Sequence, residues 1–316
     1  MLVGALLSGT ASGAEFGPDE MVIVLNSGDG SVSVVDPVRR KEVRRIPVGK
    51  EPHHLMPTPD GRELIVANAA SNDLVFLDAK SGEIRRRVEN ISDPYQLGYS
   101  PDRKWFVSAS NRLDRVDIYH ASDFRLAKRI PLSKVPSHIA FSADSSTAFV
   151  SLQDSNEIAA IDLDKQVVIW KMSTGSQPAG LWMTPDDRHL LVGMTGESHV
   201  EVYDWRARKL VKRLLTGQGA HNFVARGDGR HVFLSNRMAN TISMIDQQTL
   251  EVKDTFAVPG GPDCMEITRD GKQLWTTSRW TRMLTVVDLD TKKVVHQILV
   301  GKSPHGLYFQ SHASRQ

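Results

Sequence analysis

The sequence places two histidines side by side in the stretch EPHHLMPTPDGRE, where His53 and His54 follow Pro52. Imidazole nitrogens ligate transition metals and transfer protons near neutral pH, so the pair is a candidate for either chemistry. The stretch is one copy of a repeat. Its proline recurs every 42 residues, at Pro52, Pro94, Pro136, Pro178, Pro262 and Pro304, with Ala220 in the remaining place.

The residues after each repeat proline form two columns. The first column reads His53, Tyr95, Ser137, Ala179, His221, Asp263 and His305, and the second reads His54, Gln96, His138, Gly180, Asn222, Cys264 and Gly306. Five of the 11 histidines fall in these two columns, far more than an even distribution would give. The columns therefore form a chemically biased set of positions.

Three imidazoles and a carboxylate of the first column match the ligand types of zinc, copper or iron. We predict His53, His221, Asp263 and His305 as metal ligands, with His54, His138 and Cys264 as additional or alternative ligands. Because side chains alternate along a strand, only one column is expected to face one point, which favours His53 over His54. The alternative is that these histidines only cap backbone groups of neighbouring loops.

A second group of residues is suited to an anion. The guanidinium fork binds carboxylate or phosphate through two hydrogen bonds, and aromatic rings offer stacking faces. We predict a site for a small anionic ligand that uses Arg112, Arg237, Arg279, Trp280, Arg282 and Tyr95. The alternative is that the arginines pair with nearby acids or are solvated.

The elements that must position these residues are short β-strands. Each repeat carries an apolar run such as LMPTP, two alternating runs such as ELIVANA and DLVFLD, and a charged run such as EIRRRVE, separated by turn residues. Aspartates end the third run at Asp36, Asp78, Asp162, Asp204, Asp246 and Asp288, with His120 in the vacant place. Four strands per repeat predict an all-β, seven-bladed β-propeller with four antiparallel strands per blade.

The two ends of the chain complement each other. The N-terminal part supplies three strands without an inner one, and SPHGLYF near the C-terminus supplies an inner strand alone. We therefore predict that the terminal strands close the ring within one blade, which leaves no free sheet edge. In a closed ring, four consecutive blades carry His221, Asp263, His305 and His53 at the same repeat position.

The pattern seen in PHHLMPTPDGRELIVANAASNDLVFLD resembles the repeat of the YVTN-repeat seven-bladed propellers, over residues 21–310. That resemblance implies an exported bacterial protein. The repeat is also distantly similar to the haem d1-binding propellers of cytochrome cd1. Those propellers have eight blades, so seven repeats argue against haem d1 as a cofactor.

Bulk properties exclude several classes. The net charge of +2 gives no pull toward nucleic acid, and the charged runs fall on outer strands. One cysteine excludes disulfides, c-type haem attachment and cysteine-rich zinc sites. We predict a signal peptide or its remnant in residues 1–14, a propeller in residues 15–310, a tail in residues 311–316, a periplasmic or secreted location, and no membrane span.

Three functions are consistent with this pattern. The first is a binding or accessory protein that holds a metal or small anionic ligand at the channel mouth. The second is a lyase, lactonase or oxidoreductase that uses the same histidines, and the third is a scaffold for a periplasmic partner protein. The binding role is preferred because no nucleophile or acid–base pair is recognisable.

Overall fold

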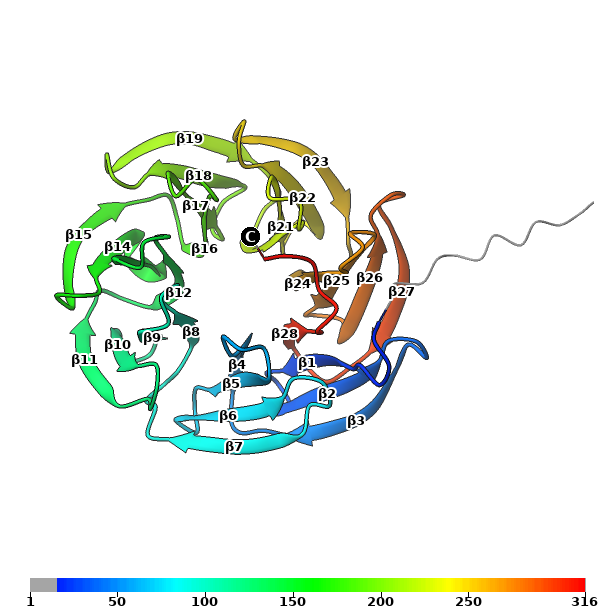
Figure 1. The fold of residues 1–316 in the computed structure, drawn as a ribbon. Coiled ribbons are helices and arrows are strands. Elements are labelled where there is room, and N and C mark those ends of the chain that lie inside the picture. Colours follow the sequence, from blue (N-terminus) through cyan, green and yellow to red (C-terminus); the bar gives the residue numbers. More distant parts are fainter. Residues whose placement is uncertain (1–15, 316) are drawn as a thin grey trace, which may run out of the picture.

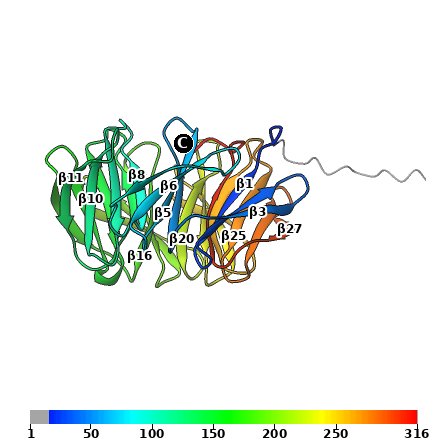
Figure 2. The same ribbon diagram turned by 90° about the horizontal axis from the view of Figure 1, so that it is seen from below.

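A computed structural model describes residues 16–315 and shows seven four-stranded antiparallel sheets arranged as blades around a central channel (Figures 1 and 2). The predicted seven-bladed β-propeller is therefore confirmed. Helix is confined, among the described residues, to one 3-10 turn, Gln153–Ser155.

The blades are numbered here from the first complete repeat, with strands given from the channel outward. Blade 1 is β4 (Pro52–Pro57), β5 (Glu63–Asn68), β6 (Asp73–Asp78) and β7 (Ile84–Glu89). Blade 2 is β8 (Gln96–Tyr99), β9 (Trp105–Ser110), β10 (Arg115–His120) and β11 (Leu126–Pro131). Blade 3 is β12 (Pro136–Phe141), β13 (Thr147–Leu152), β14 (Glu157–Asp162) and β15 (Val167–Ser173).

The same order holds in the other blades. Blade 4 is β16 (Pro178–Met183), β17 (His189–Met194), β18 (His199–Asp204) and β19 (Lys209–Leu215). Blade 5 is β20 (Ala220–Ala225), β21 (His231–Asn236), β22 (Thr241–Asp246) and β23 (Glu251–Ala257). Blade 6 is β24 (Pro262–Ile267), β25 (Gln273–Ser278), β26 (Met283–Asp288) and β27 (Lys293–Leu299). Blade 7 is β28 (Pro304–Tyr308), β1 (Val22–Asn26), β2 (Ser31–Asp36) and β3 (Lys41–Pro47).

Blade 7 closes the ring. Its inner strand β28 pairs antiparallel with β1, with Leu307 opposite Val24 and Tyr308 opposite Ile23. The predicted closure by both terminal strands is confirmed. Apolar clusters then span adjacent blades: Ile23 and Val34 of blade 7 pack with Leu64 and Val66 of blade 1.

The repeated aspartates order the turns between the third and fourth strands. Asp36 Oδ1, for example, accepts hydrogen bonds from the backbone N–H groups of Val38 and Arg39. Such side-chain to backbone bonds stabilise a tight turn, which explains why the residue recurs in six repeats.

The described segment that follows β28 packs against the ring. Ser311 N–H donates to Glu20 Oε1 at 2.5 Å, and Ala313 N–H donates to the Ile267 carbonyl at 2.7 Å. The predicted signal peptide lies outside the described residues, so export stays a prediction. Across residues 16–315, no helix combines the length and apolar character needed to span a bilayer.

We predict that deleting residues 303–316 abolishes stable folding, because it removes β28 and exposes the edge of β1. Thermal unfolding by circular dichroism, with size-exclusion chromatography for aggregation, measures the effect. A control truncation of residues 314–316 keeps β28 and every strand pairing, so it should lose much less stability than the longer deletion. An unchanged profile in the longer deletion would contradict closure by this strand.

Candidate functional site in the central channel

All seven residues of the second column line the channel cavity, together with His53 and His305 of the first column. A register shift between Pro52 and His54, and equivalent shifts at Pro136, Pro178, Ala220 and Pro262, place two inner-strand residues opposite one residue of the next strand. A β-bulge of this kind breaks the alternation of side chains. The bulge loosens the alternation expected of a regular strand, so that Cys264 of the second column lies beside Asp263 and His305 of the first.

Hydroxyl groups of the second strand support three of these bulges. The amides of His138, Asn222 and Cys264 donate to Ser151 Oγ, Ser235 Oγ and Thr277 Oγ1 at 3.0–3.1 Å. The sequence signal that could have revealed the bulge is this serine or threonine at one repeat position of β13, β21 and β25.

Asp263 is the centre of the polar cluster and is fully buried. Its Oδ1 lies 2.9 Å from His221 Nδ1 and accepts a hydrogen bond from Asn222 Nδ2 at 3.0 Å. Its Oδ2 lies 3.2 Å from His305 Nδ1, and the NH1 groups of Arg279 and Arg237 donate to it at 3.2 and 3.5 Å. The structure thus brings predicted metal ligands and predicted anion-binding arginines onto one carboxylate.

The cluster keeps Asp263 ionised and its histidines neutral. Burial alone raises the pKa of Asp263, but contacts with His305, His221 and Arg237 outweigh burial and hold the pKa well below its usual value. Burial, followed by the charge of Arg237, lowers the pKa of His221 to about 4. The His221–Asp263 contact lacks hydrogen-bond alignment, so His221 Nδ1 is a buried nitrogen without an aligned partner.

A directional chain of contacts joins three of the predicted residues to Tyr95. His53 Nδ1 lies 3.1 Å from the Tyr95 carbonyl oxygen, which can only accept, so this nitrogen carries the proton. Burial lowers the pKa of His53 and of His305, and each ring is neutral. The bare Nε2 of His53 then accepts from His305 Nε2–H at 3.1 Å.

His305 Nδ1 lies 3.2 Å from Asp263 Oδ2 and 3.7 Å from Cys264 Sγ. Burial raises the pKa of the Cys264 thiol well above its usual value, so the thiol is protonated. Asn222 Nδ2 lies 3.5 Å from the same sulfur, and this residue escaped the sequence analysis because amides are common in loops.

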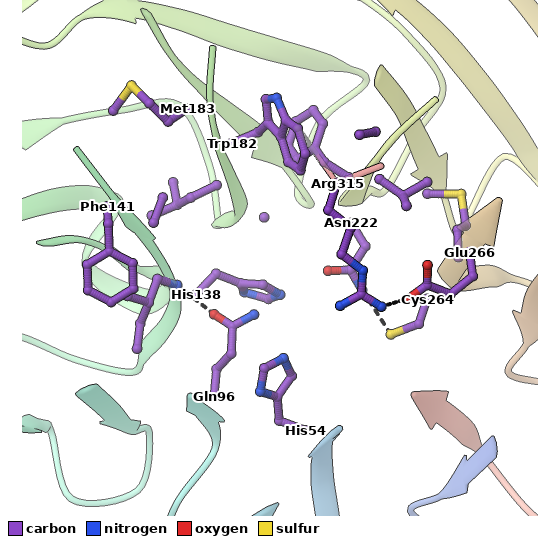
Figure 3. A pocket seen from close by; sticks show the side chains of 18 of the residues that line it. His54, Gln96, His138, Phe141, Trp182, Met183, Asn222, Cys264, Glu266 and Arg315 are labelled. Carbon is purple, nitrogen blue, oxygen red and sulfur yellow. Dashed lines mark hydrogen bonds and ion pairs between the residues drawn. The ribbon is translucent and has the colours of Figure 1, made fainter. Parts of the chain in front are cut away.

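The other two candidate histidines are held separately. His54 Nδ1 accepts from the Leu97 amide at 3.2 Å, and burial lowers the pKa of His54 to about 3. His138 Nδ1 lies 2.8 Å from Ser137 Oγ. Both rings border the channel cavity, but neither joins the Asp263 contacts (Figure 3).

The remaining predicted ligand residues do not gather into one anion site. Arg112 is paired with Asp93 at 2.8 Å and with Glu51 at 2.7 Å, as in the alternative of local pairing. Trp280 is 52% exposed, and Arg282 is exposed in the same loop. Tyr95 stacks on His53 with ring centroids 3.5 Å apart.

Beyond the histidines the channel widens into a cavity of about 760 Å³. Its walls are largely apolar and include Leu181, Trp182, Phe223 and Met265. Gly180 lets the inner strands β16 and β20 pack closely together, because a Cβ atom at this position would stand 1.6 Å from the His221 carbonyl oxygen.

Two charged residues that the sequence analysis missed border this cavity (Figure 3). Glu266 is buried at 5% exposure and forms an ion pair with Arg315. Burial raises the pKa of Glu266 to about 7 despite the opposing effect of Arg315. An acid in the fifth inner-strand position, where other repeats carry apolar or small residues, was the available signal.

The sequence matches, over residues 2–315, the model of a family described as YNCE-like beta-propeller. No curated protein sequence matches the chain. Among solved structures, a functionally unknown protein from Desulfotomaculum acetoxidans is 16% identical, with 93% of this chain and 100% of that chain covered and a TM-score of 0.79.

Two further solved structures share the fold. Hydrazine synthase of Kuenenia stuttgartiensis is 19% identical, with 81% of this chain and 88% of that chain covered and a TM-score of 0.68. Dihydro-haem d1 dehydrogenase NirN in complex with DHE is 19% identical, with 96% and 78% covered and a TM-score of 0.68. At these identities the likeness is one of fold, and one propeller fold carries many unrelated sites.

We predict that stability falls as the pH drops below about 6.5, the usual imidazole pKa. His54 resists protonation in the folded protein, where its pKa is about 3, but accepts a proton in the unfolded chain. Its contribution is therefore present above pH 6.5 and is lost as the pH falls toward 3. Urea unfolding on either side of pH 6.5 should show a weaker pH dependence for His54→Gln, whereas His189→Gln, outside the channel, should follow the parent. Identical dependence in parent and His54→Gln would contradict this.

We predict that Asp263→Ala lowers the free energy of unfolding by about 3 kcal/mol, because removing one partner of a buried charge cluster strands the others. Asp263→Asn keeps the side-chain shape and one acceptor oxygen, so its loss should be smaller. Urea unfolding measures both. A loss under about 0.5 kcal/mol, typical of surface sites, would show that Asp263 does not hold the cluster together.

Proposed function

The chain belongs to the YNCE-like β-propeller family, and we propose that its channel binds a transition-metal ion through Asp263, Cys264 and His305. These three residues offer a carboxylate oxygen, a sulfur and an imidazole nitrogen within 4.8 Å of one another. The proposal narrows the predicted metal set, which also contained His53 and His221.

The spacing of the donor atoms supports the proposal. A tetrahedral zinc ion separates nitrogen and oxygen ligands by about 3.4 Å, and nitrogen and sulfur ligands by about 3.6 Å, given its usual bond lengths. His305 Nδ1 lies 3.2 Å from Asp263 Oδ2 and 3.7 Å from Cys264 Sγ. Two of the three donor pairs are thus near ligand spacing and the third lies within 4.8 Å, and this is the observation that carries the proposal.

The hydrogen-bond chain suits a metal ligand. His305 Nδ1 faces the other two donor atoms, and an incoming ion would replace the protons that lie between them. His53 would keep accepting from His305 Nε2–H, the role that outer partners of metal-bound imidazoles take. In this arrangement His53 is a positioning residue and Asn222 braces Asp263 and Cys264.

The two arginines near Asp263 oppose the binding of a metal cation by charge repulsion. Arg279 and Arg237 contact Oδ2 at 3.2 and 3.5 Å, which is long for charge-assisted hydrogen bonds of about 2.7–2.9 Å. The carboxylate therefore keeps capacity for another cation. His221 Nδ1, which has no aligned partner, lies 2.9 Å from Asp263 Oδ1 and stays outside the group of three donors.

The neighbouring Cys264 and His305 also raise the alternative of nucleophilic catalysis. A nucleophilic cysteine needs a lowered pKa and access to its substrate. Burial instead raises the pKa of Cys264, which supports a binding or accessory role over an enzyme. This role remains the preferred one, ahead of a scaffold without a small ligand.

Titration of the metal-stripped protein with Zn²⁺ and Co²⁺ tests the proposal. We expect one ion per chain and, with Co²⁺, a near-ultraviolet thiolate charge-transfer band that Cys264→Ser abolishes. His305→Ala should weaken affinity by more than about 100-fold, and His53→Ala by about 10–100-fold, the usual loss for an outer partner.

His54→Ala is the matched control, because its imidazole lies in the same channel but bonds to the Leu97 amide. Its metal affinity should equal that of the parent. Absence of stoichiometric binding, or a Co²⁺ spectrum unchanged by Cys264→Ser, would refute this site.

A further inference from the structure

The channel cavity holds one acidic and one basic side chain among the described residues that line it, and the two belong to different kinds of structure. Glu266 projects from the inner strand β24, which is hydrogen-bonded to β25. Arg315 comes from the segment after β28, and its guanidinium reaches the Glu266 carboxylate inside the cavity (Figure 3). Glu266 therefore belongs to a strand of the ring, whereas Arg315 belongs to the segment that follows the last strand.

The segment that delivers Arg315 runs along the inner rim of the ring. Figure 1 shows it passing from β28 beside β24 to the C-terminal mark near β21. His312 forms a β-bridge with Thr268, and Ala313 packs against Gly227 of blade 5. Arg315 then turns inward, with its side chain 37% exposed against 7% for Glu266.

We propose that the cavity is a binding site for an organic cation, an ammonium or amidinium group on a flat apolar body, and that Arg315 occupies the cation's place on Glu266. Arg315 and the ligand would then compete for the Glu266 carboxylate. The proposal concerns the cavity beside the metal site and stands whether or not a metal binds.

The walls around Glu266 suit such a ligand. The cavity, at about 760 Å³, is within the size range of small-molecule sites. Trp182 and Phe223 form an aromatic wall with centroids 6.5 Å apart, and Trp182 Nε1 is fixed by a 2.6 Å hydrogen bond to Gln247. Aromatic faces attract cations and pack on flat rings.

The burial of Glu266 favours a positively charged ligand over a negatively charged one. A buried carboxylate without a partner is costly, so loss of Arg315 leaves a demand for another cation. An anion would have to bind Arg315 next to the Glu266 carboxylate. His54 and His138, which also border the cavity, are neutral because burial lowers the pKa of each, so they do not repel a cation.

Calorimetric titration with benzamidine, a flat aromatic cation, tests the proposal at a series of alkaline pH values, because Arg315→Met removes the two contacts that lower the pKa of Glu266. Arg315→Met keeps much of the apolar stem and removes the charge. We expect it to bind benzamidine at least 10-fold more tightly than the parent. Adding Glu266→Gln to this variant should abolish the gain, and neutral benzamide should bind weakly and equally to all three proteins.

Several results would overturn the proposal. They are equal benzamidine affinity in parent and Arg315→Met, a gain that survives Glu266→Gln, or benzoate binding to the parent that Arg315→Met removes. The last result would make Arg315 the receptor of an anion. His305→Ala in the Arg315→Met background should retain benzamidine binding, which separates this test from that of the metal site.

Discussion

Closure of the ring by the pairing of β28 with β1 is the constraint on which the channel depends. Each blade buries apolar side chains against both neighbours, so an open ring would expose two apolar faces as well as a strand edge. Closure also fixes the circumference. With a constant repeat length, equivalent residues stand at equivalent heights around the axis, and the composition of two sequence columns becomes the composition of one end of the channel.

The β-bulge at the start of the inner strands determines how many residues of the two columns can contact one another. A regular strand would turn one column toward the axis and the other into the blade. The extra residue in six of the seven inner strands loosens this alternation, and serine or threonine hydroxyls satisfy the displaced amides of three strands. For this reason Cys264, of the second column, can lie beside Asp263 and His305, of the first.

The sequence was sufficient for the architecture but only partly for the site. Strand number, blade number and closure follow from periodicity, because seven copies of one pattern repeat the same local signals. The bias of the columns also identified Asp263, His221 and His305. Pairwise contacts were out of reach: nothing in the spacing of Arg112 shows that Asp93 and Glu51 neutralise it, whereas Arg237 and Arg279 share Asp263. Glu266 and Arg315 are 49 residues apart and meet only because the chain end folds back along the rim.

The two charged clusters of the channel, around Asp263 and around Glu266, differ in which parts of the chain supply their partners. Around Asp263 the partners are strand and loop residues of the ring, so the cluster is as permanent as the fold. Around Glu266 the partner is the second-to-last residue of the chain, and its removal costs no strand pairing. A fixed cluster is suited to holding an ion in one geometry, and a replaceable partner is suited to exchange with a ligand. Under the two proposals the same channel carries a permanent site and an exchangeable one, and the segment after β28 supplies the charge that a ligand would replace.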